Sequence, residues 1–189
     1  MSALPTIAFA KPGKSPTGVA IIFAAADNKI SKAAREIAGP SLDKALAAAD
    51  FKGKANAVAD ILAPAGTTLD RLIVVGAGKP EEHGESAWLK LGGTAASKLG
   101  KAKAASVLLD IEATAIPAGS AADFALGLLL RAYTFDKYKT KKDDNGKPDV
   151  SAKITILTAD PAGAKKQYAS RQSVFEGVAL ARDLVNEPA

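Results

Sequence analysis

The sequence contains no cysteine, which excludes a disulfide framework and a thiolate metal site and fits a reducing compartment. It contains one histidine, His83, in the polar turn Pro80-Glu-Glu-His-Gly84, where we expect a solvated loop side chain rather than a catalytic base. Without cysteine, a divalent metal needs histidines and clustered carboxylates, but the acidic residues are scattered or stand beside lysines. The sequence therefore predicts no metal site in this chain.

Targeting and membrane-spanning signals are also lacking. No basic residue precedes Lys11 and Pro5 interrupts the apolar start, whereas a secretory signal has a basic start and an unbroken apolar core. The densest apolar run, Phe124–Leu130, is far shorter than the ~20 residues of a membrane span and is followed directly by Arg131. We therefore expect a cytoplasmic protein that does not enter a membrane.

The composition is that of an ordinary globular protein, with 48% hydrophobic and 24% charged residues. A length of 189 residues suffices for one sizeable core, or for one domain and part of a second. The net charge of +5 raises the question of nucleic-acid binding. We favour the interpretation that this positive charge comes from dispersed lysines, which keep a small domain in solution.

Apolar runs predict the strands of a sheet. Leu72–Val75 consists of four aliphatic residues, which suits a strand buried on both faces. Further strands are predicted at Thr6–Ala10, Gly18–Ala25, Ala57–Leu62, Ala105–Asp110 and Lys153–Leu157. Ala57–Leu62 should lie beside Leu72–Val75, because only a short connection separates them. Helical patterns lie between several strands, so the fold class is α/β.

Helices are predicted at Ser31–Ile37, Ser41–Ala49, Ser86–Lys101, Ala121–Phe135 and Arg171–Asn186. Ser41 stands where a cap would help, and Ser120-Ala-Ala-Asp123 has the form of a capping box. Gly92-Gly93 weakens the third helix, so we expect close approach to another backbone there.

The last predicted helix carries Val174, Val178 and Val185 on one stripe. Because the stripe is continuous and apolar, we expect it to pack on the sheet of the same domain. On that view Val178→Asp would bury a charge without a partner and destabilise the fold strongly.

The glycines of Gly76-Ala77-Gly78 follow a strand, as in nucleotide-binding loops, but the spacing fails both common motifs. A dinucleotide fingerprint needs glycine where Glu81 stands. A Walker A loop needs glycine where Ile73 stands and serine or threonine where Pro80 stands. A tight turn at the strand exit is predicted instead.

The remaining acidic residues do not form a site either. Asp143–Gly146 fails as a calcium loop, because Lys141 and Ala152 would occupy the first and twelfth ligand positions. It belongs to Lys137–Asp149, a lysine-rich stretch that predicts an exposed loop. The adjacent Glu81-Glu82 lies in a loop. We predict no catalytic, cofactor-binding or metal-binding residue in this chain.

The run Glu176-Gly-Val-Ala-Leu-Ala-Arg-Asp-Leu-Val-Asn-Glu-Pro-Ala189 resembles the junction segment of the leucyl aminopeptidases, a dinuclear-zinc family of cytosolic exopeptidases. In that family the segment joins an N-terminal α/β domain to the catalytic domain. Asp70–Lys79 is similar to the family's central strand and turn, and Ala125–Lys139 resembles its helix that ends in an aromatic and basic run.

The resemblance implies that residues 1–170 form a macro-like α/β domain, with a mixed, mostly parallel sheet flanked by helices on both faces. Residues 171–189 would then be a helix and junction leading to a C-terminal catalytic domain. The family's metal ligands lie beyond the junction, so two divalent metals, zinc or manganese, are implied for that domain and none for this chain. The implied function is a non-catalytic assembly domain of a hexameric enzyme that removes N-terminal amino acids from peptides.

Two other functions stay open at this point. A free-standing macro-like domain would bind ADP-ribose or another nucleotide, since macro domains use loops other than the failed glycine motifs. A nucleic-acid-binding module would rest on the net charge and the lysines around Lys137–Lys147. The resemblance is compatible with this function, because the N-terminal domain of some bacterial members of the family is credited with contacting DNA.

Overall fold

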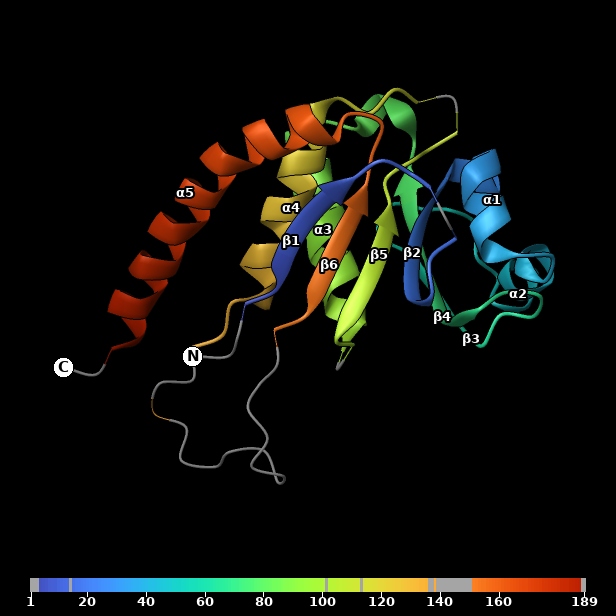
Figure 1. Ribbon diagram of the computed structural model, residues 1–189, viewed down its shortest axis with the longest axis horizontal. Coiled ribbons are helices and arrows are strands. Elements are labelled where there is room, and N and C mark those ends of the chain that lie inside the picture. The colour runs from blue at the N-terminus through green and yellow to red at the C-terminus, as the bar shows by residue number, and fades with distance from the viewer. Residues whose placement is uncertain are drawn as a thin grey trace.

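The computed structural model describes residues 4–13, 15–100, 102–112, 114–135, 138 and 151–187 (Figure 1). The strands are β1 (Thr6–Ala10), β2 (Gly18–Ala25), β3 (Val58–Leu62), β4 (Leu69–Gly78), β5 (Ala104–Leu108) and β6 (Lys153–Leu157). The α-helices are α1 (Lys32–Ala38), α2 (Leu42–Ala48), α3 (Glu85–Leu99), α4 (Ala118–Ala132) and α5 (Pro161–Asn186). Short 3-10 helices, η1 (Ala26–Asn28) and η2 (Pro80–Glu82), follow β2 and β4. Apart from Tyr138, the predicted loop Lys137–Asp149 lies outside the described residues.

The six strands form one mixed sheet in the order β1-β6-β5-β2-β4-β3. All neighbouring pairs are parallel except β3 and β4, which are antiparallel and joined by a short connection. The predicted α/β class with a mixed, mostly parallel sheet is therefore confirmed, as is the adjacency of the two strands. Leu72–Val75 is fully buried, as its four aliphatic residues predicted.

Helices cover both faces of the sheet, and side chains that alternate along the central strands reach both layers. On one face, Ile21 and Phe23 of β2 pack with Trp88 of α3 and Phe124 of α4. On the other face, Ala20 and Ile22 pack against α1 and α2. Figure 1 shows α3 and α4 together on one face, with α5 running along the outer side of α4 beside β1.

The close approach predicted at Gly92-Gly93 is confirmed for Gly92 but not for Gly93, where an added Cβ would stand 3.9 Å from its nearest neighbours. A Cβ added to Gly92 of α3 would stand 2.1 Å from the Phe124 carbonyl oxygen of α4, and a Cβ added to Gly127 would stand 2.1 Å from that of Leu89. The two helices therefore touch backbone to backbone, and each provides a glycine at the contact. A side chain at either position would force them apart.

Two predicted caps are wrong. Ser41 precedes α2 but its hydroxyl caps nothing, and its oxygen is buried without a hydrogen-bond partner among the described residues. The run Ser120–Asp123 lies inside α4, which begins three residues earlier than predicted, directly after Pro117. Pro117 has an extended backbone conformation with φ of −62°, so the chain enters the helix without a side-chain cap.

The last helix begins ten residues earlier than predicted. Pro161 occupies its first turn and the Asp160 carboxylate accepts a hydrogen bond from the Gly163 amide at 2.9 Å, which caps the helix. The predicted start, Arg171, therefore lies inside a continuous helix of 26 residues.

Candidate functional site

The carboxyl edge of the parallel strands is where α/β folds usually bind small ligands. Here the loop of residues 51–57 lies against that edge beside β2 and β4. The Gly53 carbonyl accepts a hydrogen bond from the Gly78 amide at 3.0 Å, and the Lys52 carbonyl accepts one from the Asp27 amide at 3.2 Å. A Cβ on Gly76 would stand 2.0 Å from the Lys54 carbonyl oxygen.

These contacts correct the interpretation of Gly76-Ala77-Gly78. The glycines do not form a turn after the strand, because β4 continues through Gly78. Gly76 and Gly78 instead let the strand pack directly on the backbone of the 51–57 loop. The close packing of the 51–57 loop, rather than a bound anion, therefore explains why glycine stands at these two positions.

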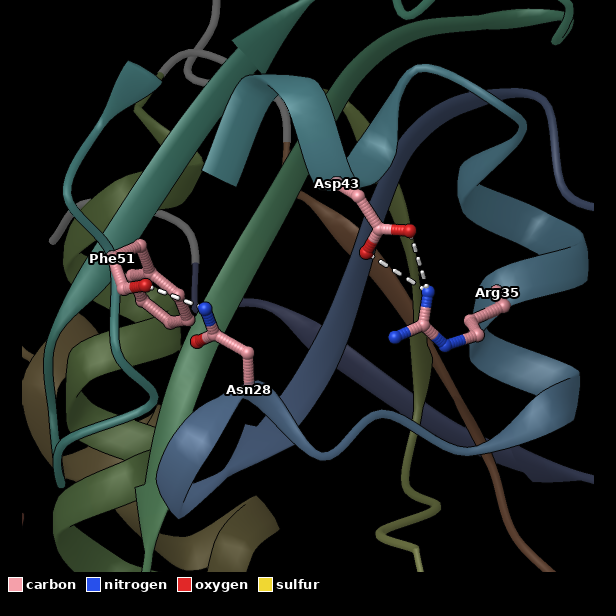
Figure 2. A network of polar contacts seen from close by, with 4 residues as sticks. All are labelled: Asn28, Arg35, Asp43 and Phe51. Carbon is pink, nitrogen blue, oxygen red and sulfur yellow. Dashed lines mark hydrogen bonds and ion pairs between the residues drawn. The ribbon is translucent and has the colours of Figure 1, made fainter. Parts of the chain in front are cut away.

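Figure 2 shows how the same loop is held from the β2 side. Asn28 has φ of 57° and turns its side chain toward the loop, and its amide nitrogen donates to the Phe51 carbonyl at 2.6 Å. The amide oxygen of Asn28 is buried and has no hydrogen-bond partner among the described residues. Nearby, Arg35 of α1 pairs with Asp43 in the first turn of α2 at 2.9 Å.

A cavity of about 290 Å³ lies beside this loop, between the end of β4 and the first turns of α3. Its polar lining comes from Asn56, Glu82, Ser86 and Lys90. Ser86 makes no hydrogen bond to a base among the residues that the structure describes, so the cavity holds no nucleophile pair of the kind that acyl transfer requires.

His83 stands next to this cavity and differs from the prediction of a solvated side chain. It is half-buried, and its ring packs on Trp88 at 5.4 Å between centroids. Its Nε2 lies 2.9 Å from the Ala77 carbonyl oxygen, an arrangement in which the ring nitrogen donates. The contact fastens the turn after β4 to the start of α3, which is a structural role.

No group of three or more histidine or acidic side chains that could hold a metal occurs among the described residues. Asp143–Gly146 lies outside the described residues, and Glu81-Glu82 lies exposed in η2. In the part of the chain that the structure describes, no metal-binding group of this kind is assembled.

The second candidate region is α5. Its inner face packs on α4 through Phe175, which contacts Leu126 and Leu129, and through a buried ion pair. Arg171 Nε donates to the Asp123 carboxylate at 2.7 Å, and the Asp123 side chain is 7% exposed. This hydrogen bond raises the pKa of Arg171 above its usual value.

The C-terminal half of α5 is held as firmly. The Tyr133 hydroxyl donates to Asp183 at 2.6 Å, which raises the pKa of Tyr133. Arg182 donates to the Leu130 carbonyl at 3.1 Å and lies over the Tyr133 ring. The inner face is therefore fixed to α4 on both sides of Phe175.

The outer face of α5 contradicts the predicted stripe. Val174 is 51% exposed and Val185 is 86% exposed, and Val178 is half-buried, so this stripe does not pack on the sheet. Leu180 and Leu184 are also exposed, at 60% and 69%. The inward residues are Ala164, Tyr168, Arg171 and Phe175, a spacing of three and four that would have revealed the inner face.

Comparisons with known proteins identify the family of the chain. Residues 21–142 match the sequence model of the cytosol aminopeptidase family, N-terminal domain. The whole chain is 48% identical to a probable cytosol aminopeptidase of Rhizobium etli and 44% identical to one of Chelativorans sp.. Each match covers 100% of this chain but 38% of the relative's length.

Solved structures share the fold. The chain matches a mutant of tomato leucine aminopeptidase with a TM-score of 0.73 and 20% identity, covering 100% of this chain and 40% of that one. It matches the bottromycin maturation enzyme BotP in complex with Mn with a TM-score of 0.62 and 18% identity, covering 90% of this chain and 32% of that one. Within the described residues, no helix is long and apolar enough to cross a bilayer.

Proposed function

The chain belongs to the cytosol aminopeptidase family, and from this premise we propose that it is the non-catalytic N-terminal domain of a longer aminopeptidase. The observation that carries the proposal is the share of length: the chain aligns in full with relatives of which it spans 38%. The family's N-terminal domain is the part that it matches. The chemistry of the longer protein would then come from the portion that follows.

Among the described residues, no group of three or more histidine or acidic side chains could hold a metal. Hydrolysis of a peptide bond at neutral pH needs an activated water and a group that polarises the carbonyl, and two divalent metals supply both. We assign the two metals, zinc or manganese, to the C-terminal portion of the longer protein. The manganese named for the structurally similar BotP agrees with that choice.

The organisation of the longer protein is part of the proposal. Residues 1–170 make up the body of the α/β domain, and residues 171–189 lead from it to the catalytic domain while Arg171 and Phe175 still pack on α4. We propose a hexameric, cytoplasmic enzyme in which the N-terminal domains contribute to assembly. The relatives are named cytosol aminopeptidases, which supports the compartment.

An activity assay tests the proposal. The 189-residue chain and the longer protein are given leucyl-p-nitroanilide with zinc or manganese over a range of concentrations. We expect turnover from the longer protein and none from the 189-residue chain, because acceleration requires groups that favour the transition state and binding alone does not supply it. Turnover that stays with the 189-residue chain through two orthogonal columns would overturn the proposal, as would a longer protein that cleaves no aminoacyl amide.

A further inference from the structure

The exposed side of α5 changes character along its length. Directly opposite the inner face, the first half of the helix presents Lys166, Ser170 and Ser173, all exposed and polar. On the same line the second half presents Leu180 and Leu184, about two to five turns further on. The transition falls close to Val174.

The second half thus forms an outer apolar patch, which consists of Val174, Leu180, Ala181, Leu184 and Val185. Loosening of the helix does not explain its exposure, because Arg182 and Asp183 in the same turns hold α4 through the bonds to Leu130 and Tyr133. A contiguous apolar patch on a well-fixed helix marks an interaction surface.

We infer that this patch is the docking site for the C-terminal portion of the same polypeptide in the longer protein, an inference that rests on the proposed function. Three observations select this occupant. The match covers 38% of the relatives' length and the family model that the chain matches is that of an N-terminal domain, so most of their length lies outside the matched region. The patch lies at the end of the helix from which that portion would continue, so the portion is tethered close to it. The other half of the same face is polar, which limits the contact to the residues nearest the tether.

The absence of cysteine from the sequence allows a direct test by thiol labelling. Leu184→Cys and Val185→Cys place a thiol in the patch, and Ser170→Cys places one on the polar half as a matched control. Each variant is made in the longer protein and in the 189-residue chain and treated with N-ethylmaleimide. Labelling is followed by mass spectrometry of the peptide that carries the new cysteine.

In the longer protein we expect positions 184 and 185 to react at least about tenfold more slowly than position 170, because docking excludes the reagent. In the 189-residue chain the three positions should react at rates within about twofold of one another. Equal rates at 170 and 184 in the longer protein would overturn the inference. Protection in the 189-residue chain that disappears on dilution would overturn it too, since a second copy would then cover the patch.

The result can be separated from failure of the proposed function. The same longer-protein preparations are assayed with leucyl-p-nitroanilide. Active enzyme with an unprotected position 184 rejects the docking site alone, whereas an inactive longer protein rejects the proposed function whatever the labelling shows.

Discussion

The helices α4 and α5 pack against each other, and both carry aliphatic side chains, more densely in α4 than in α5, but the domain uses them differently. Residues 121–129 of α4 are all buried. Among the 26 residues of α5, Ala164 and Phe175 alone are buried. The domain therefore covers the middle of α4 on all sides, whereas it covers α5 on one side.

The difference lies in what the neighbours supply. α4 is enclosed by the sheet, by α3 at a glycine contact and by α5. α5 is the outermost layer and meets α4 and β1 alone among the elements with extensive contacts. Apolar residues on its far side therefore cannot be explained by the stability of this domain, which points to a function for them elsewhere.

Breaking the α3–α4 contact should have the largest effect. Gly127→Val would drive a side chain into the Leu89 backbone, where even a Cβ would stand at 2.1 Å. We expect a loss of at least about 3 kcal/mol in the free energy of unfolding, or failure to fold. The control Gly119→Ala lies in the first turn of the same helix with open space around it and should be neutral or slightly stabilising. Equal urea midpoints for Gly127→Val and the unsubstituted chain would contradict the close contact.

The buried ion pair between α4 and α5 comes next. Arg171→Ala leaves the Asp123 carboxylate buried without its partner and should cost about 2 kcal/mol, less than for a fully enclosed pair because Arg171 is partly exposed. The double variant Asp123→Leu with Arg171→Leu removes both charges and should recover most of the loss. Urea denaturation of both variants measures the difference. A double variant as unstable as the single one would show that the pair is not what fixes α5.

An exposed pair sharpens the same comparison and should have a smaller effect than the buried one. Arg71 of β4 bonds Asp60 of β3 at 2.5 Å, and the Asp60 side chain is 40% exposed. The hydrogen bond from Arg71 lowers the pKa of Asp60 below its ordinary 3.8. The pair therefore stabilises the fold fully above that ordinary value, and the contribution is lost as pH falls through the lowered pKa.

Because solvent screens this pair, Asp60→Asn should reduce stability at pH 7 by less than about 1 kcal/mol. The reduction should vanish in acid, where Asp60 is protonated in both folded and unfolded chains. Denaturation curves at pH 7 and at the lowest pH where the chain stays folded provide the measurement. A deficit that grows toward low pH would contradict the assigned sign.

Much of this fold could be predicted from sequence because its signals are local. Four aliphatic residues in a row fix β4 as a buried strand, and Gly92-Gly93 in a helical pattern indicates close contact without naming the partner. The α/β class follows from alternating strand and helix patterns. The family followed from the Glu176–Ala189 run, which is specific.

What failed depends on contacts distant in sequence. Gly76 reads as a turn residue unless the 51–57 loop is known to lie on the strand. Ser120–Asp123 has the residues of a capping box, but the helix begins earlier, directly after Pro117. Asp123 instead accepts a hydrogen bond from Arg171, 48 residues away. In α5 apolar residues lie on the outer side as well as the inner side, so hydrophobic pattern alone did not tell which side the domain covers.

The two sides of α5 allow the most direct test, in the 189-residue chain itself. Phe175→Ala removes a side chain that is 5% exposed on the inner face, and Leu184→Ala removes one that is 69% exposed on the outer face. Urea denaturation should show a loss of about 3 kcal/mol for Phe175→Ala and less than about 0.5 kcal/mol for Leu184→Ala. A loss at Leu184 comparable to that at Phe175 would show that the domain covers the patch itself, and would contradict the account.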